Sequence, residues 1–157
     1  LGTISERRIE DLVNPTLSHL PAFLIEKGGL NTGLMMLQVT AAALASENKL
    51  LASPASIDSI PTSANKEDYV CMGVTAARKA REILKNVQRI IAIELICAAQ
   101  GLEFSNPEEA GIGVRKLYRL IRAHIPPLIE DRPLYLDIDK VYRLIKNNYH
   151  VIQSTLS

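Results

Sequence analysis

The 157-residue sequence has few aromatic residues and no excess of either charge. Aromatic residues make up 4% of the chain and tryptophan is absent, so the stacking platforms that hold nucleic-acid bases are not expected. Lysine and arginine together number 18, against 17 aspartates and glutamates, which leaves a net charge of +1 and no basic surface for phosphates. We therefore expect no nucleic-acid partner.

Cysteines and long apolar runs are also scarce. The only two cysteines, Cys71 and Cys97, fall on one predicted helix at a separation of roughly 39 Å, which is too far for a disulfide. We expect both to be reduced, buried thiols in a cytoplasmic protein. The longest apolar windows, Leu34–Ala45 and Ile90–Ala99, are shorter than the ~20 residues of a membrane span, so no membrane partner is expected. We expect no signal peptide, because acids and arginines fill the first eleven residues, and the absence of an initial Met suggests part of a longer protein.

What the chain does contain is a helical pattern of apolar residues, at 47% apolar and 22% charged composition, with no strand pattern. The sequence predicts an all-α fold. Asn65 is a good N-cap with Glu67 and Asp68 behind it, Asn106 precedes a proline and two acids, and Asp137 can cap the last helix. The expected helices cover residues 1–12, 33–51, 65–101, 106–123 and 137–147.

Two of these helices have apolar residues on almost every side, in the windows Leu34–Ala45 and Ile90–Ala99. Such helices lie inside a large core or an interface. A chain of this length has limited means to cover both, so we predict a homo-oligomer, a dimer or tetramer, with Ile90–Ala99 in the interface. Glu94 lies within the second window, and we expect it to pair with an arginine.

No metal site is predicted, because the three histidines, His19, His124 and His150, show no ligand spacing. No phosphate-binding glycine loop and no nucleophile–base pair stand out either. One polar loop, residues 61–68, stands out as it enters the longest helix, although plain helix capping would also explain its residues.

Several long motifs follow one another in the order found in the aromatic amino-acid ammonia-lyase and aminomutase family. The chain resembles the C-terminal part of that family, closely over residues 1–104 and loosely over 105–157. We therefore expect a central helical-bundle segment at 1–104 and C-terminal helices at 105–157. The motifs are Glu6–Ile9, Leu20–Leu24, Gly29–Met35, Gln38–Lys49, Ser56–Asp68, Ile93–Leu95 and Ala98–Gly101.

The resemblance implies a homotetramer built around a long-helix bundle. It also implies deamination of a small-molecule amino acid, L-histidine, to urocanate and ammonia. The family's electrophile is a methylidene-imidazolone that the protein makes from an Ala-Ser-Gly tripeptide. Ala-Ser occurs three times here but is followed by Glu47, Pro54 and Ile57, never by glycine. We therefore expect no cofactor in this chain, an electrophile supplied by an N-terminal half or companion subunit, and no activity of the chain alone.

Two site residues transfer from the family to this sequence. Glu67, in Thr62-Ser63-Ala64-Asn65-Lys66-Glu67-Asp68, takes the place of a catalytic carboxylate in the substrate pocket. Met35 takes the place of a methionine beside the substrate ring, although core packing would explain it equally well. The Glu67 motif favours the histidine branch, whereas Lys66, Tyr69 and Cys71 depart from it. The alternatives are a relative that acts on phenylalanine or tyrosine, and a non-catalytic α-helical oligomerisation module.

Overall fold

The computed structural model describes residues 1–57 and 59–147, and these form helices joined by loops, with no strand among them. The all-α prediction is therefore confirmed. Two isolated backbone bridges, Gly28 with Asn31 and Thr62 with Glu67, are the only strand-like pairings in this part of the chain. The elements are α1 (Gly2–Val13), α2 (Pro15–Ser18), η1 (Ala22–Leu24), α3 (Met35–Leu51), α4 (Gly73–Leu102), η2 (Pro107–Glu109), α5 (Ile112–Arg122) and α6 (Tyr135–Asn147).

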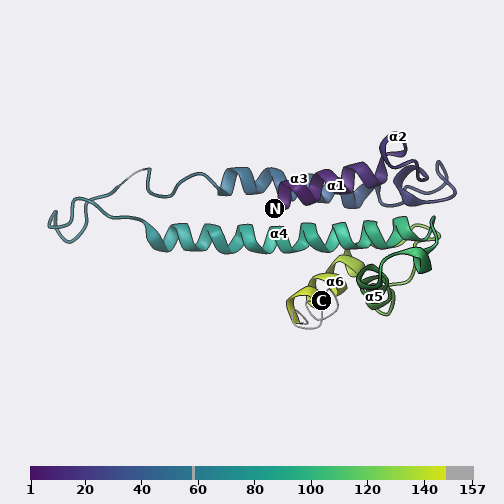
Figure 1. Ribbon diagram of the computed structural model, residues 1–157. Helices are drawn as coiled ribbons and strands as arrows, with labels where there is room; N and C mark the ends of the chain where they lie inside the picture. The colour runs from purple at the N-terminus through teal and green to yellow at the C-terminus, as the bar shows by residue number, and fades with distance from the viewer. Residues whose placement is uncertain (58, 148–157) are drawn as a thin grey trace.

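Helix α4 is the axis of the molecule (Figure 1). Its 30 residues span about 45 Å. Helices α1 and α3 pack on one side of α4 and on each other, while α5 and α6 contact α4 on its other side, toward its C-terminal end. The segment between α3 and α4 projects beyond these helices. Within the described residues, no helix combines the length and apolarity needed to cross a membrane.

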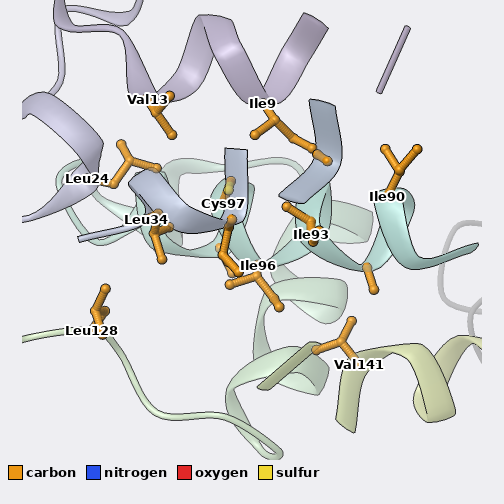
Figure 2. Packing of buried hydrophobic residues seen from close by; sticks show 14 of the residues in the cluster. Ile9, Val13, Leu24, Leu34, Ile90, Ile93, Ile96, Cys97, Leu128 and Val141 are labelled. Carbon is orange, nitrogen blue, oxygen red and sulfur yellow. The ribbon is translucent and has the colours of Figure 1, made fainter. Parts of the chain in front are cut away.

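The apolar core lies where α1, α3, α5 and α6 meet the C-terminal half of α4 (Figure 2). Ile90, Ile93 and Cys97 of α4 are fully buried there, against Ile9 of α1 and Val141 of α6. Six of the ten residues of Ile90–Ala99 are buried within this one chain, because helices far away in the sequence pack on them. The window therefore depends less on a partner chain than its apolar pattern predicted. The half of α4 before Asn86 contributes no buried residue.

The start of the longest helix is also corrected. It begins at Gly73 and not at Asn65, because Ser63, Ala64 and Asn65 all have positive φ angles that an α-helix cannot accommodate. Met72, at φ 49°, is the residue before the helix, and no side chain caps it. The local capping pattern therefore misled the prediction, since the backbone turns back on itself at these residues.

Two further helix starts differ from the prediction. Asn106 does cap a helix, through a 3.2 Å hydrogen bond from the amide of Glu108, but this is the short 3-10 helix η2. The chain becomes extended at Ala110 and Gly111 before α5 begins. Asp137 lies in the first turn of α6 rather than before it, where its buried carboxylate accepts a 3.0 Å hydrogen bond from Arg132.

Some predictions for single residues are confirmed and one is wrong. Glu94 pairs with Arg8 at 3.1 Å, which confirms the predicted ion pair. Cys97 is buried and Cys71 is exposed, so the prediction that both thiols are buried is wrong for Cys71, although both are free. His19 and His124 are exposed, and His150 lies outside the described residues.

Candidate functional site

Glu67 lies on the projecting segment between α3 and α4, on the closing side of a tight turn. The amide of Thr62 donates to the Glu67 carbonyl at 2.8 Å, and the amide of Glu67 donates back at 3.3 Å. The Thr62 hydroxyl also donates to the Glu67 carboxylate at 3.3 Å. The side chain is exposed and lies outside any helix. Glu67 therefore does not lie in the first turn of the longest helix, as its sequence position after Asn65 had suggested.

Met35 is the first residue of α3 and is half-buried. Its amide donates to the Thr32 carbonyl at 3.3 Å, so its position depends on the turn before the helix. Beside that turn is a hollow of about 350 Å³, and the neighbouring Met36 lines it while Met35 does not. The other lining residues are Thr32, Gly33, Leu37, Thr40, Asp131, Arg132, Leu134, Tyr135 and Ile138.

The structure does not bring Glu67 and Met35 together. Met35 begins α3 and the projecting segment starts after the helix ends, so the rest of this 17-residue helix, about 24 Å, lies between them. Glu67 belongs to the segment between α3 and α4, and that segment extends away from the helices (Figure 1). A single amino-acid substrate is far shorter than this separation, so it cannot contact both residues of one chain.

The backbone before α3 is strained at several points. We call residues 28–34 the entry turn. Gly29 and Gly33 have positive φ angles there, as do Phe23 and Leu24 in the adjoining η1. The Leu34 amide donates to the Phe23 carbonyl at 2.9 Å, which joins η1 to the entry turn. Non-glycine residues with positive φ persist only where the surrounding structure fixes them.

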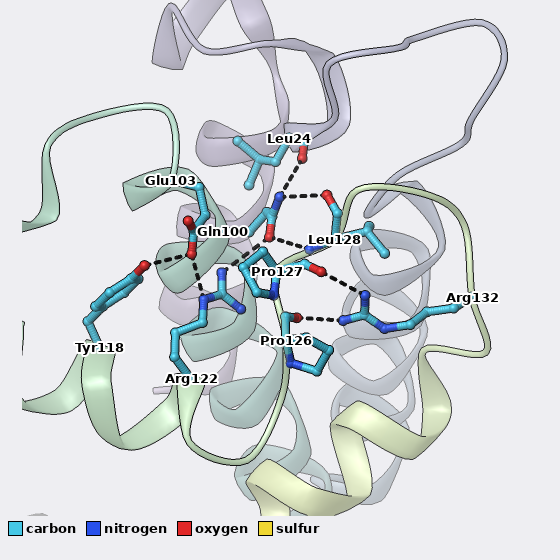
Figure 3. A network of polar contacts seen from close by, with 9 residues as sticks. All are labelled: Leu24, Gln100, Glu103, Tyr118, Arg122, Pro126, Pro127, Leu128 and Arg132. Carbon is cyan, nitrogen blue, oxygen red and sulfur yellow. Dashed lines mark hydrogen bonds and ion pairs between the residues drawn. The ribbon is translucent and has the colours of Figure 1, made fainter.

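A buried glutamine holds part of this strained backbone in place through hydrogen bonds (Figure 3). Gln100, only 3% exposed at the end of α4, donates from Nε2 to the carbonyls of Leu24 at 3.2 Å and Leu128 at 3.0 Å. Its Oε1 accepts from the Leu128 amide at 2.9 Å and from Arg122 at 3.2 Å. The polar groups of its side chain are therefore satisfied, and they fix η1 against residues 126–132.

Asp131 holds the entry turn in place. Its Oδ2 accepts from the amide and the hydroxyl of Thr32, both at 2.8 Å, and its Oδ1 accepts from the Gly33 amide at 3.0 Å. Its own amide donates to Asn31 Oδ1 at 3.2 Å. The hydrogen bond from the Thr32 amide is the main reason that the pKa of the Asp131 carboxyl lies below its ordinary value of 3.8.

Neither Gln100 nor Asp131 was predicted from the sequence as a residue of the site. A polar residue at a core position after the apolar run Ile90–Ala99 is the signal that could have marked Gln100. Asp131 carries no such signal, because its partners lie about 100 residues away in the sequence.

The arrangement suits binding and positioning more than bond chemistry. No cluster of histidine, cysteine or acidic side chains that could hold a metal ion occurs in residues 1–57 and 59–147. The Cys97 thiol is unsuited to nucleophilic work, since burial raises its pKa to about 12. What the described residues offer is an exposed carboxylate on the projecting segment and a methionine at the first position of α3, directly after the entry turn.

The chain matches the family model described as aromatic amino acid lyase over residues 1–123. It is 57% identical over 147 residues to a histidine ammonia-lyase of Caldanaerobacter subterraneus subsp. tengcongensis, and 58% identical over 147 residues to one of Symbiobacterium thermophilum. Each alignment covers 94% of this chain and 29% of the relative. The chain therefore spans less than a third of the length of these curated relatives.

Solved structures give the same result for the fold. The crystal structure of histidine ammonia-lyase from Trypanosoma cruzi superposes with a TM-score of 0.93 at 49% identity, over 99% of this chain and 31% of that one. A tyrosine aminomutase from Streptomyces globisporus superposes with a TM-score of 0.90 at 33% identity, over 96% of this chain and 29% of that one. Both structures have nearly the same backbone as this chain, but the histidine ammonia-lyase is more similar to it in sequence.

Proposed function

Because the chain belongs to the aromatic amino acid lyase family, we propose that it is the C-terminal part of an enzyme that deaminates L-histidine to urocanate and ammonia. The observation that carries this proposal is the high identity to histidine ammonia-lyases across almost the whole chain. Identity is much lower to the tyrosine aminomutase, although its fold is almost as close. Since the backbone barely separates the two, the side chains are the better guide to the substrate.

The reaction needs an electrophile that this chain does not supply. A methylidene-imidazolone forms from Ala-Ser-Gly, and none of the three Ala-Ser pairs here is followed by glycine. The first of them, Ala45-Ser46, lies inside α3 and continues into Glu47. The residues present do not fit the formation of this group, so we assign it to the rest of the enzyme and give this chain the task of binding substrate.

In this proposal, Glu67 is the carboxylate that holds the ammonium or imidazole group of the substrate. Its exposure in this chain leaves it free to enter a pocket completed by other residues. Met35 packs beside the substrate ring. Because one substrate cannot reach both residues of one chain, we propose a homo-oligomer whose pocket takes Met35 from one copy and Glu67 from another.

Exposed apolar side chains support the assembly. Ile57 and Ile60 on the projecting segment are 76% and 60% exposed. Val74 and Leu84, on the half of α4 before Asn86, are 70% and 57% exposed. Large apolar side chains left exposed together are typical of an interface. We place this interface on the half of α4 before Asn86, not at Ile90–Ala99. The proposed location of the enzyme is the cytoplasm.

The test is an assay of the complete enzyme and of this chain alone with L-histidine, in which urocanate is followed by its ultraviolet absorbance. We expect turnover by the complete enzyme and none above background by the chain alone. Parallel assays with L-phenylalanine and L-tyrosine test the other substrates of the family. A complete enzyme that forms no urocanate would refute the proposed substrate, and a complete enzyme inactive on all three amino acids would favour a non-catalytic oligomerisation module.

A further inference from the structure

The entry turn is a costly conformation that leads directly into Met35. A Cβ atom at Gly33 would lie 2.5 Å from the carbonyl oxygen of Phe23 and 2.9 Å from Cγ2 of Ile25, so the backbone approaches closely here. Phe23 and Leu24, both with positive φ, lie on the other side of this approach. Strained backbone of this kind is often found beside functional sites, where the surrounding structure fixes it.

Asp131 binds the turn at its most constrained point. Its two carboxylate oxygens accept all three hydrogen bonds described above from Thr32 and Gly33, and its amide donates a fourth to Asn31 Oδ1. These contacts fix two consecutive backbone amides just before the helix. The Met35 amide bonds to the Thr32 carbonyl, so the orientation of Thr32 is passed on to Met35.

The segment that carries Asp131 is itself anchored independently. Arg132 donates to the carbonyls of Pro126 at 2.7 Å and Pro127 at 2.9 Å, and it pairs with the buried Asp137 at 2.8 Å. Gln100 holds Leu128 through both its amide and its carbonyl (Figure 3). Asp131 therefore reaches the entry turn from a rigid support.

We propose that Asp131 is a positioning residue of the substrate pocket, which acts by holding Thr32 and Gly33 so that α3 begins with Met35 in one fixed place. This inference rests on the proposed function, since the contact of Met35 with the substrate comes from there. Asp131 does not touch the substrate in this scheme. The hydrogen bonds from Thr32 and Gly33 lower the pKa of the Asp131 carboxyl, because they favour the charged form that can accept all three of them.

The test compares Asp131→Asn with Glu130→Gln in the complete enzyme. The asparagine keeps the shape of the side chain but turns an NH2 group toward one of the backbone amides, so the hold on the turn is broken. Glu130 is the adjacent exposed carboxylate and makes no hydrogen bond or ion pair with the described residues, so its variant controls for the lost charge. Thr32→Val removes only the hydroxyl bond and serves as a milder second variant.

Two measurements are made on each variant. Hydrogen exchange followed by mass spectrometry reports on the amides of residues 28–36, and steady-state kinetics gives KM and kcat for L-histidine. We expect Asp131→Asn to speed exchange in this peptide and to raise KM roughly tenfold to a hundredfold, with kcat within about threefold. Thr32→Val should change KM in the same direction by less, and Glu130→Gln should change neither measurement.

A purely structural role would give a different pattern, because loss of folded enzyme lowers the apparent kcat and leaves KM unchanged. That pattern, or an equal effect of Glu130→Gln, would overturn the inference. Faster exchange with an unchanged KM would overturn it as well, since the turn would then be loosened without consequence for the substrate. A wild-type enzyme without histidine turnover would instead refute the proposed function, and the exchange data would still decide whether Asp131 holds the turn.

Discussion

Glu67 differs from its neighbour Asp68 in what each could do, although both are exposed carboxylates on the projecting segment. Neither lies in the first turn of a helix, so neither contributes through a helix dipole. The stability of the protein should therefore be almost indifferent to both charges. If Glu67 binds the substrate, its replacement should lower the rate of turnover instead. Without the carboxylate, the positive charge of the substrate would have no partner in a pocket that excludes water.

We predict that Glu67→Gln in the complete enzyme lowers kcat/KM for L-histidine by about 100-fold, the equivalent of about 3 kcal/mol. Its melting temperature should stay within about 2 °C of the wild type. Asp68→Asn is the matched control and should leave turnover within about threefold of the wild type. Equal turnover in both variants, close to that of the wild type, would show that Glu67 was wrongly transferred from the family.

At the scale of single elements, the entry turn offers the clearest test of stored strain. Gly33→Ala forces an alanine into φ +58° and pushes its Cβ against the Phe23 carbonyl. We predict that this change destabilises the chain by at least about 2 kcal/mol, which lowers the melting temperature by roughly 4–8 °C. Far-ultraviolet circular dichroism during thermal unfolding measures this.

The matched control for that prediction is Gly28→Ala. A Cβ atom at Gly28 meets no other atom within 4 Å, and its φ does not fall in the left-handed region. Alanine there should be neutral or slightly stabilising, because it restricts the unfolded chain. Similar melting temperatures for the two variants would mean that the entry turn relaxes freely.

Sequence patterns predicted the helices whose signals are local and missed the features that depend on distant contacts. Helices α1 and α3 were located to within one or two residues, because an apolar stripe and a proline or glycine boundary specify each of them. Asn65 carries an equally good local signal, yet the chain there forms a turn closed by Thr62 and Glu67. The hold of Asp131 on Thr32 depends on the tertiary fold alone, so no local pattern could predict it.

At the scale of the whole molecule, the positions of Met35 and Glu67 matter more than either residue alone. The family resemblance assigns both to one pocket, while the structure places Met35 at the start of α3 and Glu67 on the segment beyond its other end. In a symmetric homo-oligomer, the start of α3 in one copy, where Met35 lies, can meet the projecting segment of another copy. The proposed pocket is then shared between chains, and variants of the two residues should complement each other.

We predict that co-expression of Met35→Ala and Glu67→Gln chains yields mixed oligomers more active than the mean of the two pure variants. With equal random mixing, about a quarter of the pockets receive native Met35 from one chain and native Glu67 from another. The measurement is urocanate formation at L-histidine concentrations well below KM, so that losses in binding and in turnover both count. The control is a mixture of the two purified variants without subunit exchange, which should give the mean. If the co-expressed oligomers also gave no more than the mean, no pocket would combine Met35 of one chain with Glu67 of another. The length of α3 does not allow one substrate to contact both residues of a single chain. The assignment of Met35 or of Glu67 to the pocket would then have to be withdrawn.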